Sequence, residues 1–133
     1  MPESSSTPLP AALGLVRVID GVLASRIHTL SLGPLGTVIG SVEVEGACIT
    51  DVEADVSARH VVVWCQDGRW WCQGLGSANG TVLISGEDKQ LTSVELPRSL
   101  RDGSTASVPV ELREGDALCL GLRTRFLVLR MGV

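Results

Sequence analysis

The chain has 133 residues, enough for one domain with a buried core. Hydrophobic residues make up 44% of it and charged residues 20%, which predicts a globular protein and excludes a disordered one. The formal net charge of -4 argues against a protein that holds nucleic acid on a basic surface, but it leaves room for a local basic pocket that binds a small anion.

Residues 1–12 are predicted to form a flexible tail, and residues 13–133 one domain. The first ten residues are rich in Ser and Pro and lack the basic start and apolar run of a signal peptide. No stretch approaches the eighteen consecutive apolar residues of a membrane-spanning helix. We therefore expect a cytoplasmic protein without membrane contact.

The first half of the domain reads as a series of short strands. Residues 13–19 alternate in hydrophobicity and are expected to form a strand. Asp20 and Gly21 supply a turn, and residues 22–27 are expected to form the strand that runs back beside the first. A separate strand is expected at 28–32, ended by Gly33 and Pro34. Further short strands are expected at 37–39, 42–44 and 48–49. Three acidic residues then alternate with apolar ones, namely Asp51, Glu53 and Asp55.

The clearest hairpin lies at 61–72 and contains all three tryptophans. If Asp67 and Gly68 form its two-residue loop, Cys65 faces Trp70 and Cys72 faces Val63. Trp70 is then predicted to lie in the core. The other two tryptophans, Trp64 and Trp71, lie on the opposite face, where they either mark a contact surface or are partly covered by a loop.

The four cysteines are expected to be reduced thiols on strands, because each lies among apolar residues and no pair has Cys-x-x-Cys spacing. In the hairpin, Cys65 and Cys72 are diagonal neighbours, so a disulfide between them is possible but not preferred. No metal site and no cofactor are predicted.

The second half adds strands at 82–84, 110–112, 117–120 and 126–129. Between them, residues 87–109 are polar and show no clear period, which predicts an inserted loop without regular structure. Two alternatives stay open for this loop, a partner-binding flap and a disordered surface loop. No segment has a sustained helical period, so the fold class is all-β, a sandwich or barrel.

Four short motifs occur in order along the chain. They are Val-Ile-Gly-Ser at 38–41, Val-Ser-Ala-Arg-His at 56–60, Leu-Gly-Ser-Ala-Asn-Gly-Thr at 75–81, and Leu-x-x-Gly-Asp-x-Leu-x-Leu-Gly at 112–121. Together they resemble the forkhead-associated (FHA) domain family, whose pattern is Ile-Gly-Arg, Ser-x-x-His, Ser-x-Asn-Gly-Thr and Leu-x-x-Gly-Asp-x-Ile-x-Leu-Gly. The resemblance covers roughly residues 30–129.

The resemblance implies a β-sandwich of about eleven short, mostly antiparallel strands, with loops at one end that bind phosphothreonine peptides. Ser57 would contact the phosphate through its hydroxyl and backbone, and Asn79 would hold the peptide backbone beside the phosphothreonine. His60 would brace the loops through hydrogen bonds to Ser77 or to the backbone near Gly40. The implied phosphopeptide-binding positions are Ser57, Arg59, Asn79, Ser41 and Ala78, and the implied supports of the loops are Gly40, His60, Ser77, Gly80 and Thr81.

Three positions depart from the family's pattern. Ser41 stands where the family has the arginine that pairs with the phosphate, and Ala58 and Ala78 stand where polar residues are frequent. Since a hydrogen bond to a charged group contributes about 1.5–3 kcal/mol, losing that arginine would weaken binding about ten- to a hundredfold. A weakened phosphate site is therefore expected.

Arg59 is a candidate replacement for the missing cation, since it follows Ser57 by two residues. The alternative is that it covers a strand face or pairs with Asp51 or Asp55. Those acids would also repel a phosphate unless they point away from it.

Two interpretations of function remain, both of a protein–protein interaction module. The first is phosphothreonine-peptide recognition in Ser/Thr kinase signalling, with a kinase or a kinase substrate as partner. The second is a degenerate FHA fold that binds a partner independently of phosphate. An enzyme is not expected: Ser57 and His60 suggest a nucleophile and base, but no oxyanion-hole glycine motif or orienting acid accompanies them.

Overall fold

The computed structural model describes residues 11–102 and 107–132. In this part of the chain every regular element is a β-strand except one turn of 3₁₀ helix, η2 (Arg98–Leu100). The strands are, in order, β1 (Ala12–Ile19), β2 (Val22–Thr29), β3 (Thr37–Ile39), β4 (Cys48–Ile49), β5 (Val61–Gln66), β6 (Arg69–Gly74), β7 (Thr81–Ile84), β8 (Leu91–Glu95), β9 (Val110–Leu112), β10 (Ala117–Leu120) and β11 (Thr124–Met131).

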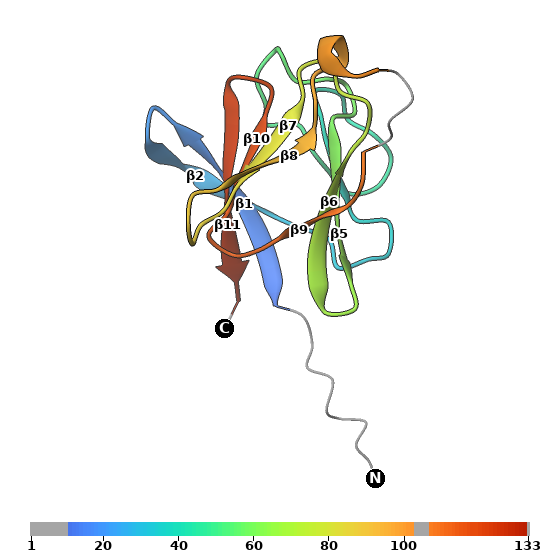
Figure 1. Cartoon of the computed structure of the whole chain (residues 1–133). Coiled ribbons are helices and arrows are strands. Elements are labelled where there is room, and N and C mark those ends of the chain that lie inside the picture. The colour runs from blue at the N-terminus through green and yellow to red at the C-terminus, as the bar shows by residue number, and fades with distance from the viewer. Residues whose placement is uncertain (1–10, 103–106, 133) are drawn as a thin grey trace.

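The strands form two sheets packed face to face (Figure 1). One has six strands in the order β2-β1-β11-β10-β7-β8, and the other has five in the order β4-β3-β5-β6-β9. Every strand pair is antiparallel except β3 with β4. The predicted all-β sandwich of eleven mostly antiparallel strands is therefore confirmed. No helix in the described residues is long and apolar enough to cross a membrane.

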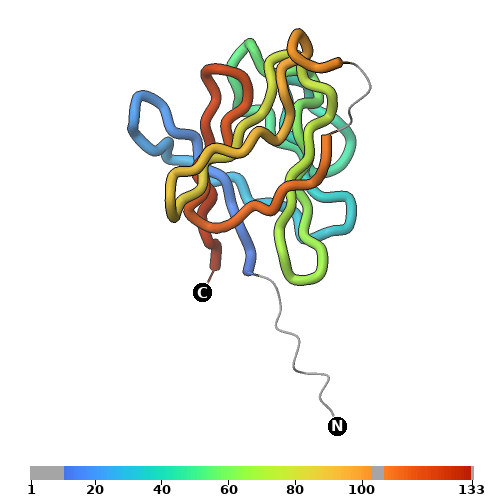
Figure 2. The backbone as a smooth tube through the Cα atoms, in the orientation of Figure 1, coloured from blue at the N-terminus to red at the C-terminus, as the bar shows by residue number. Residues whose placement is uncertain are grey.

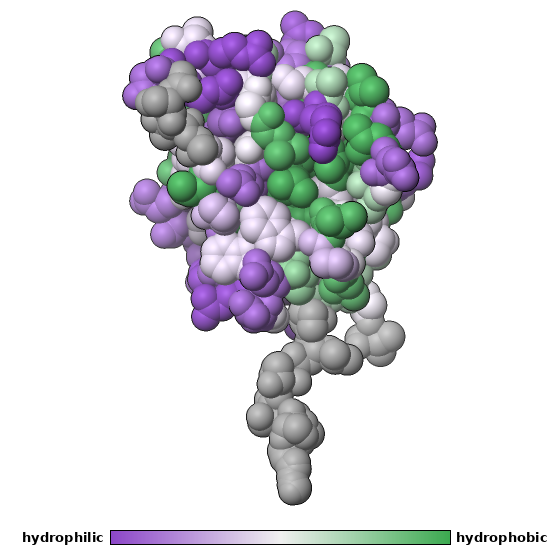
Figure 3. Space-filling model, turned by 90° about the vertical axis from the view of Figure 1, so that its right-hand side faces the viewer, coloured by the Kyte–Doolittle hydropathy of each residue, from purple (hydrophilic) through white to green (hydrophobic). Residues whose placement is uncertain are grey.

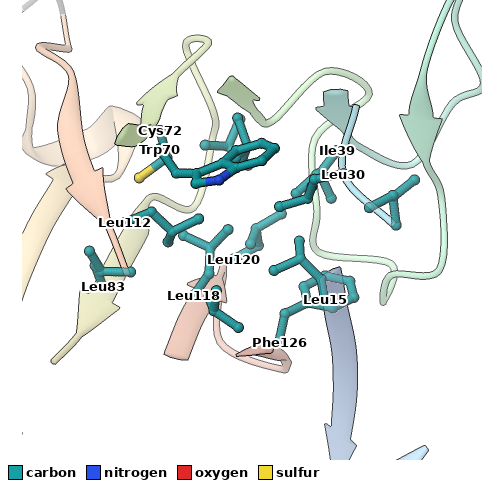
Figure 4. Close-up of a cluster of buried hydrophobic side chains, with 14 of the residues drawn as sticks. Leu15, Leu30, Ile39, Trp70, Cys72, Leu83, Leu112, Leu118, Leu120 and Phe126 are labelled. Carbon is teal, nitrogen blue, oxygen red and sulfur yellow. The ribbon is translucent and has the colours of Figure 1, made fainter. Parts of the chain in front are cut away.

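Alternating apolar side chains from both sheets fill the space between them (Figure 4). Trp70 on β6 is buried and donates its indole N–H to the carbonyl of Ala11 at 2.8 Å. It shares this layer with Phe126 of β11 and Leu118 of β10, both fully buried. The core fixes the strand ends, and so fixes the loops that leave them.

The predicted hairpin is confirmed in its register. Cys65 pairs with Trp70 and Val63 with Cys72, while Trp64 pairs with Trp71 on the outer face. Both outer tryptophans are half-buried. All four cysteines are free, and burial raises the pKa of the Cys72 thiol to about 12, which keeps it protonated.

Three element predictions are wrong. Residues 28–32 are not a separate strand, because β2 runs to Thr29 and Leu30 then enters the core. Residues 42–44 form no strand; Val42 instead donates its amide to the carbonyl of Ala58 at 3.4 Å. Residues 87–109 are not without regular structure, since β8 and η2 lie within them. Most of the predicted tail, residues 1–10, lies outside the described residues.

Candidate functional site

Three connections meet at one end of the sandwich: residues 40–47 between β3 and β4, 50–60 between β4 and β5, and 75–80 between β6 and β7 (Figure 2). Backbone bonds hold them together. Ser41 donates its amide to the carbonyl of Ser57 at 3.0 Å, and Leu75 donates to the carbonyl of His60 at 3.0 Å. The motifs at 38–41, 56–60 and 75–81 are therefore neighbours in space, as the resemblance implied.

Ser57 lies at the centre of this end. Its half-buried hydroxyl oxygen accepts a hydrogen bond from the amide of Ala78 at 2.9 Å, which joins the second loop to the third. A serine hydroxyl also carries a proton, so Ser57 can donate to an incoming oxygen while it accepts from Ala78. The Ser57 hydroxyl therefore joins two loops and is also a candidate contact for a ligand.

His60 is fully buried directly beneath Ser57. Its Nδ1 accepts a hydrogen bond from the amide of Ser57 at 3.0 Å, and its Nε2 lies 2.8 Å from the carbonyl of Gly80. These two bonds require a neutral ring with the proton on Nε2. The side chain of His60 therefore braces two loops through Ser57 and Gly80. Its amide donates to the carbonyl of Ile39, next to Gly40, at 2.9 Å, so a bond to the backbone near Gly40 is present. The ring does not bond Ser77, the other expected partner.

The environment keeps His60 neutral. Burial lowers the pKa of the imidazole, and this outweighs the opposing effects of the Gly80 carbonyl and of the charges on Glu95 and Asp55. Protonating Nδ1 would remove the acceptor for the Ser57 amide, so the charged ring does not fit the brace.

This pKa shift predicts a pH dependence of stability. The folded-state pKa lies below the ordinary 6.5, so the unfolded chain binds more protons in the interval between the two values. The contribution of neutral His60 to the free energy of unfolding is complete above pH 6.5 and is lost as the pH falls from 6.5 to the folded-state pKa. Urea unfolding at a series of pH values should show this slope for the wild type, and His60→Gln should flatten it. An unchanged slope in the variant would contradict the brace.

The Asn-Gly turn is tied to the second loop. Asn79 is exposed, and its Nδ2 donates to the carbonyl of Asp55 at 2.8 Å. Gly80 has a φ of +82°, and a Cβ there would lie 2.9 Å from the carbonyl oxygen of Glu95, so the position requires glycine. Thr81, the next residue, is buried and begins β7.

The acidic residues before Ser57 are engaged in structural contacts. Arg17 is buried and pairs with Asp51 at 3.1 Å and Glu53 at 2.9 Å. Asp55 accepts from the amide of Leu122 at 2.8 Å through Oδ2. These contacts hold the loop on the six-stranded sheet, and the single positive charge of buried Arg17 partly offsets the two negative charges of Asp51 and Glu53.

Ser41, which stands where the family has its arginine, and Arg59, the candidate replacement cation, differ in position. Ser41 is exposed and lies beside Ser57 through its backbone. Arg59 is exposed too, but it lines a hollow on the outer face of the five-stranded sheet with Val38 and Val62. Within the described residues it forms no ion pair with Asp51 or Asp55. Of its two expected roles, covering the strand face is the one the contacts favour.

Sequence reasoning missed a buried carboxylate behind the third loop. Glu95, at the end of β8, accepts from the amides of Gly76 and Ser77 at 3.0 and 2.8 Å and from the Ser77 hydroxyl at 2.7 Å. Arg101 lies 3.5 Å away and also donates to the carbonyl of Ser77 at 2.8 Å. No motif marks Glu95, and residues 87–109 show no clear period that would have predicted β8.

These contacts lower the pKa of Glu95. Burial alone would raise it, but the hydrogen bonds from Ser77 and Gly76 and the charge of Arg101 outweigh burial. An ionised Glu95 therefore holds Gly76 and Ser77 of the third loop, next to the Ala78 amide that bonds Ser57. The geometry at this end of the sandwich is that of a rigid polar surface, with exposed positions at Ser41, Ala58 and Asn79.

Comparison with known proteins agrees with this geometry. The FHA domain profile matches residues 37–121. Among curated proteins no significant match was found. Solved structures with the same fold include the FHA domain of an Arabidopsis thaliana hypothetical protein, at 26% identity and a TM-score of 0.59, covering 100% of this chain and 97% of that one.

Two other similar structures are complexes. The FHA domain of human APLF with an XRCC1 bisphospho peptide is 21% identical, with a TM-score of 0.60, and covers 90% of this chain and 99% of that one. The MEK1 FHA domain with a HOP1 phosphothreonine peptide is 16% identical, with a TM-score of 0.58, and covers 94% and 100%. The profile spans more than half of the chain, so the protein belongs to the FHA domain family, non-catalytic interaction modules that bind phosphothreonine peptides.

Proposed function

We propose that this chain recognises phosphothreonine in a partner protein of Ser/Thr kinase signalling, with a phosphate site weaker than the family pattern implies. The observation that carries the proposal is the frame around Ser57, whose hydroxyl is fixed by the Ala78 amide and whose amide is fixed by neutral His60. A fixed hydroxyl costs little conformational entropy when it binds an oxyanion. The similar APLF and MEK1 domains, solved with phosphorylated peptides, support the ligand class.

The weakening follows from the side chains around that frame. Ser41 replaces an arginine, and Ala58 and Ala78 offer no side-chain donor. A phosphate dianion is bound most strongly by charge-assisted hydrogen bonds, which are about twice as strong as neutral ones. Binding through the Ser57 hydroxyl and the Asn79 side chain is therefore expected to be detectable but weak, and to depend on each of these contacts.

A second candidate function is a contact independent of phosphate, favoured by the apolar outer face of the five-stranded sheet (Figure 3). Leu35 is 88% exposed there and lines a hollow with Val62 and Trp64. Large exposed apolar areas mark interaction sites more often than chance. Binding on this face would leave the Ser57 loops unused, which separates the two candidates experimentally.

The test is a titration of the protein with a degenerate phosphothreonine peptide pool and its unphosphorylated twin. We expect tighter binding of the phosphorylated pool. In Ser57→Ala that preference should fall by about tenfold or more, since a hydrogen bond to a charged group is lost. Ser25→Ala removes a hydroxyl from exposed β2 and should bind as the wild type does. Equal binding of both pools by the wild type would contradict the proposal and favour the outer face.

A further inference from the structure

The connection from β8 to β9 brings an arginine to the recognition end. We propose that Arg98, on η2, supplies the guanidinium that pairs with the phosphate of the bound peptide. This inference rests on the proposed function and names the cation for that site. In Figure 2 the orange segment that contains η2 lies at the same end as the segments around residues 55 and 78.

The backbone of Arg98 is anchored on the third loop. Its amide donates to the carbonyl of Ala78 at 2.9 Å, and its guanidinium donates to the carbonyl of Gly76 at 3.0 Å. The side chain is otherwise exposed, and no carboxylate among the described residues forms an ion pair with it. Arg98 is thus a cation with a fixed backbone, and within residues 11–102 and 107–132 no acidic side chain neutralises its charge.

The distances place Ser57 within reach of this side chain. Ala78 bonds the Ser57 hydroxyl through its amide and Arg98 through its carbonyl, each at 2.9 Å. One residue separates its own N and O by no more than about 3.6 Å, so the Arg98 amide lies no more than about 9.4 Å from the Ser57 hydroxyl. An extended arginine side chain spans about 6–7 Å, enough to meet a phosphate held on Ser57.

The Arg98 guanidinium can leave the Gly76 carbonyl for a phosphate without an energetic penalty. The bond from Arg98 to the Gly76 carbonyl has one charged partner, whereas a guanidinium–phosphate contact joins two opposite charges and is the stronger of the two. A guanidinium can also bind two phosphate oxygens at once. The η2 backbone does not have to move, because the amide of Arg98 remains bonded to Ala78.

The neighbouring arginines are less suited. Arg101 is mostly buried and is committed to Glu95 and to the carbonyls of Ser77 and Leu96. Arg59 lines the outer face of the five-stranded sheet. Arg123 lines a hollow with Asp20 beside the β1–β2 turn. Arg98 is the described arginine that combines exposure, a fixed backbone and direct contact with the loop that bonds Ser57.

The test compares Arg98→Gln and Arg98→Lys with wild type, using a phosphothreonine pool that contains no Asp or Glu and its unphosphorylated twin. Gln keeps a polar side chain with an N–H donor but carries no charge, whereas Lys keeps the charge. We expect Arg98→Gln to weaken binding of the phosphorylated pool about tenfold and to flatten its salt dependence, with Lys in between. Arg69→Gln removes an exposed charge at the far hairpin and should bind as wild type does.

The outcomes separate the two proposals. If the wild type prefers the phosphorylated pool and loses that preference in Ser57→Ala but not in Arg98→Gln, the role of Arg98 is overturned and the proposed function stands. If Gln and Lys weaken binding equally and both lower the melting temperature, Arg98 only supports the loop, which also overturns it. A loss seen only with pools that contain Asp or Glu shows that Arg98 reads an acidic side chain instead. A wild type without preference overturns both proposals.

Discussion

Replacing Glu95 by alanine is expected to lower the free energy of unfolding by about 3–5 kcal/mol, because removing one partner of a buried ion pair leaves the other uncompensated. The exposed fraction of the Glu95 side chain is 5%, and that of Arg101 is 15%. The variant also leaves the amides of Gly76 and Ser77 without their acceptor. Chemical denaturation of the variant and the wild type at pH 7 measures the difference.

The control for this prediction is Glu111→Ala. Glu111 pairs with Arg113 at 3.2 Å, but the exposed fraction of the Arg113 side chain is 64%, so the loss should stay below about 1 kcal/mol. The Glu95 effect should also depend on pH: its folded-state pKa lies below the ordinary 4.5, so its stabilisation is present above that value and is lost as the pH falls below it. A Glu95→Ala variant as stable as the control would show that the third loop does not depend on this carboxylate.

Gly40→Ala is expected to abolish phosphopeptide binding and to cost about 1–3 kcal/mol of stability, as overpacking does. A Cβ at Gly40 would overlap the carbonyl of Ala58 and lie 3.0 Å from the Cα of Arg59, both of them backbone atoms that cannot rotate away. The segment that carries Ser57 would have to move, and the bond from the Ser41 amide to the Ser57 carbonyl would stretch or break. Peptide titration and thermal unfolding of the same sample measure both effects.

Gly33→Ala is the matched control, because a Cβ there meets only the hydroxyl of Ser31 at 3.3 Å. That side chain can shift, so both stability and binding should change little. If Gly40→Ala retained wild-type affinity, the loop contact around Ser57 would not be the binding frame.

The sequence predicted those features that local chemistry decides. Asp67 and Gly68 have φ values of +55° and +77°, and this tight turn fixed the register of the hairpin from Cys65 to Trp70. The resemblance, carried by motifs that lie far apart in the chain, implied that the binding loops lie at one end of the sandwich, and the segments at 38–41, 56–60 and 75–81 are neighbours there. In each case a short pattern carried enough information to predict the neighbours.

Features that depend on long-range contacts were not predictable. Glu95 bonds residues eighteen and nineteen positions earlier, and its own segment has three exposed residues in a row before Val94, so neither a period nor a motif marked β8. The side-chain partners of His60 were not foreseen for the same reason, since Gly80 lies beside the ring only once β7 and β5 are in place. No strand forms at 42–44, because the amide of Val42 bonds the carbonyl of Ala58, which belongs to a loop and not to a neighbouring strand.

The most direct test of the account is to follow the backbone amide NMR signals of the protein while the phosphothreonine pool is added. We predict that the signals of Ser57, Ala78 and Asn79 move, and that they stay in place with the unphosphorylated twin. The indole signals of Trp64 and Trp71 should not move. Shifts confined to the tryptophans and Leu35, alike with both pools, would contradict the account and identify the outer face of the five-stranded sheet as the binding surface.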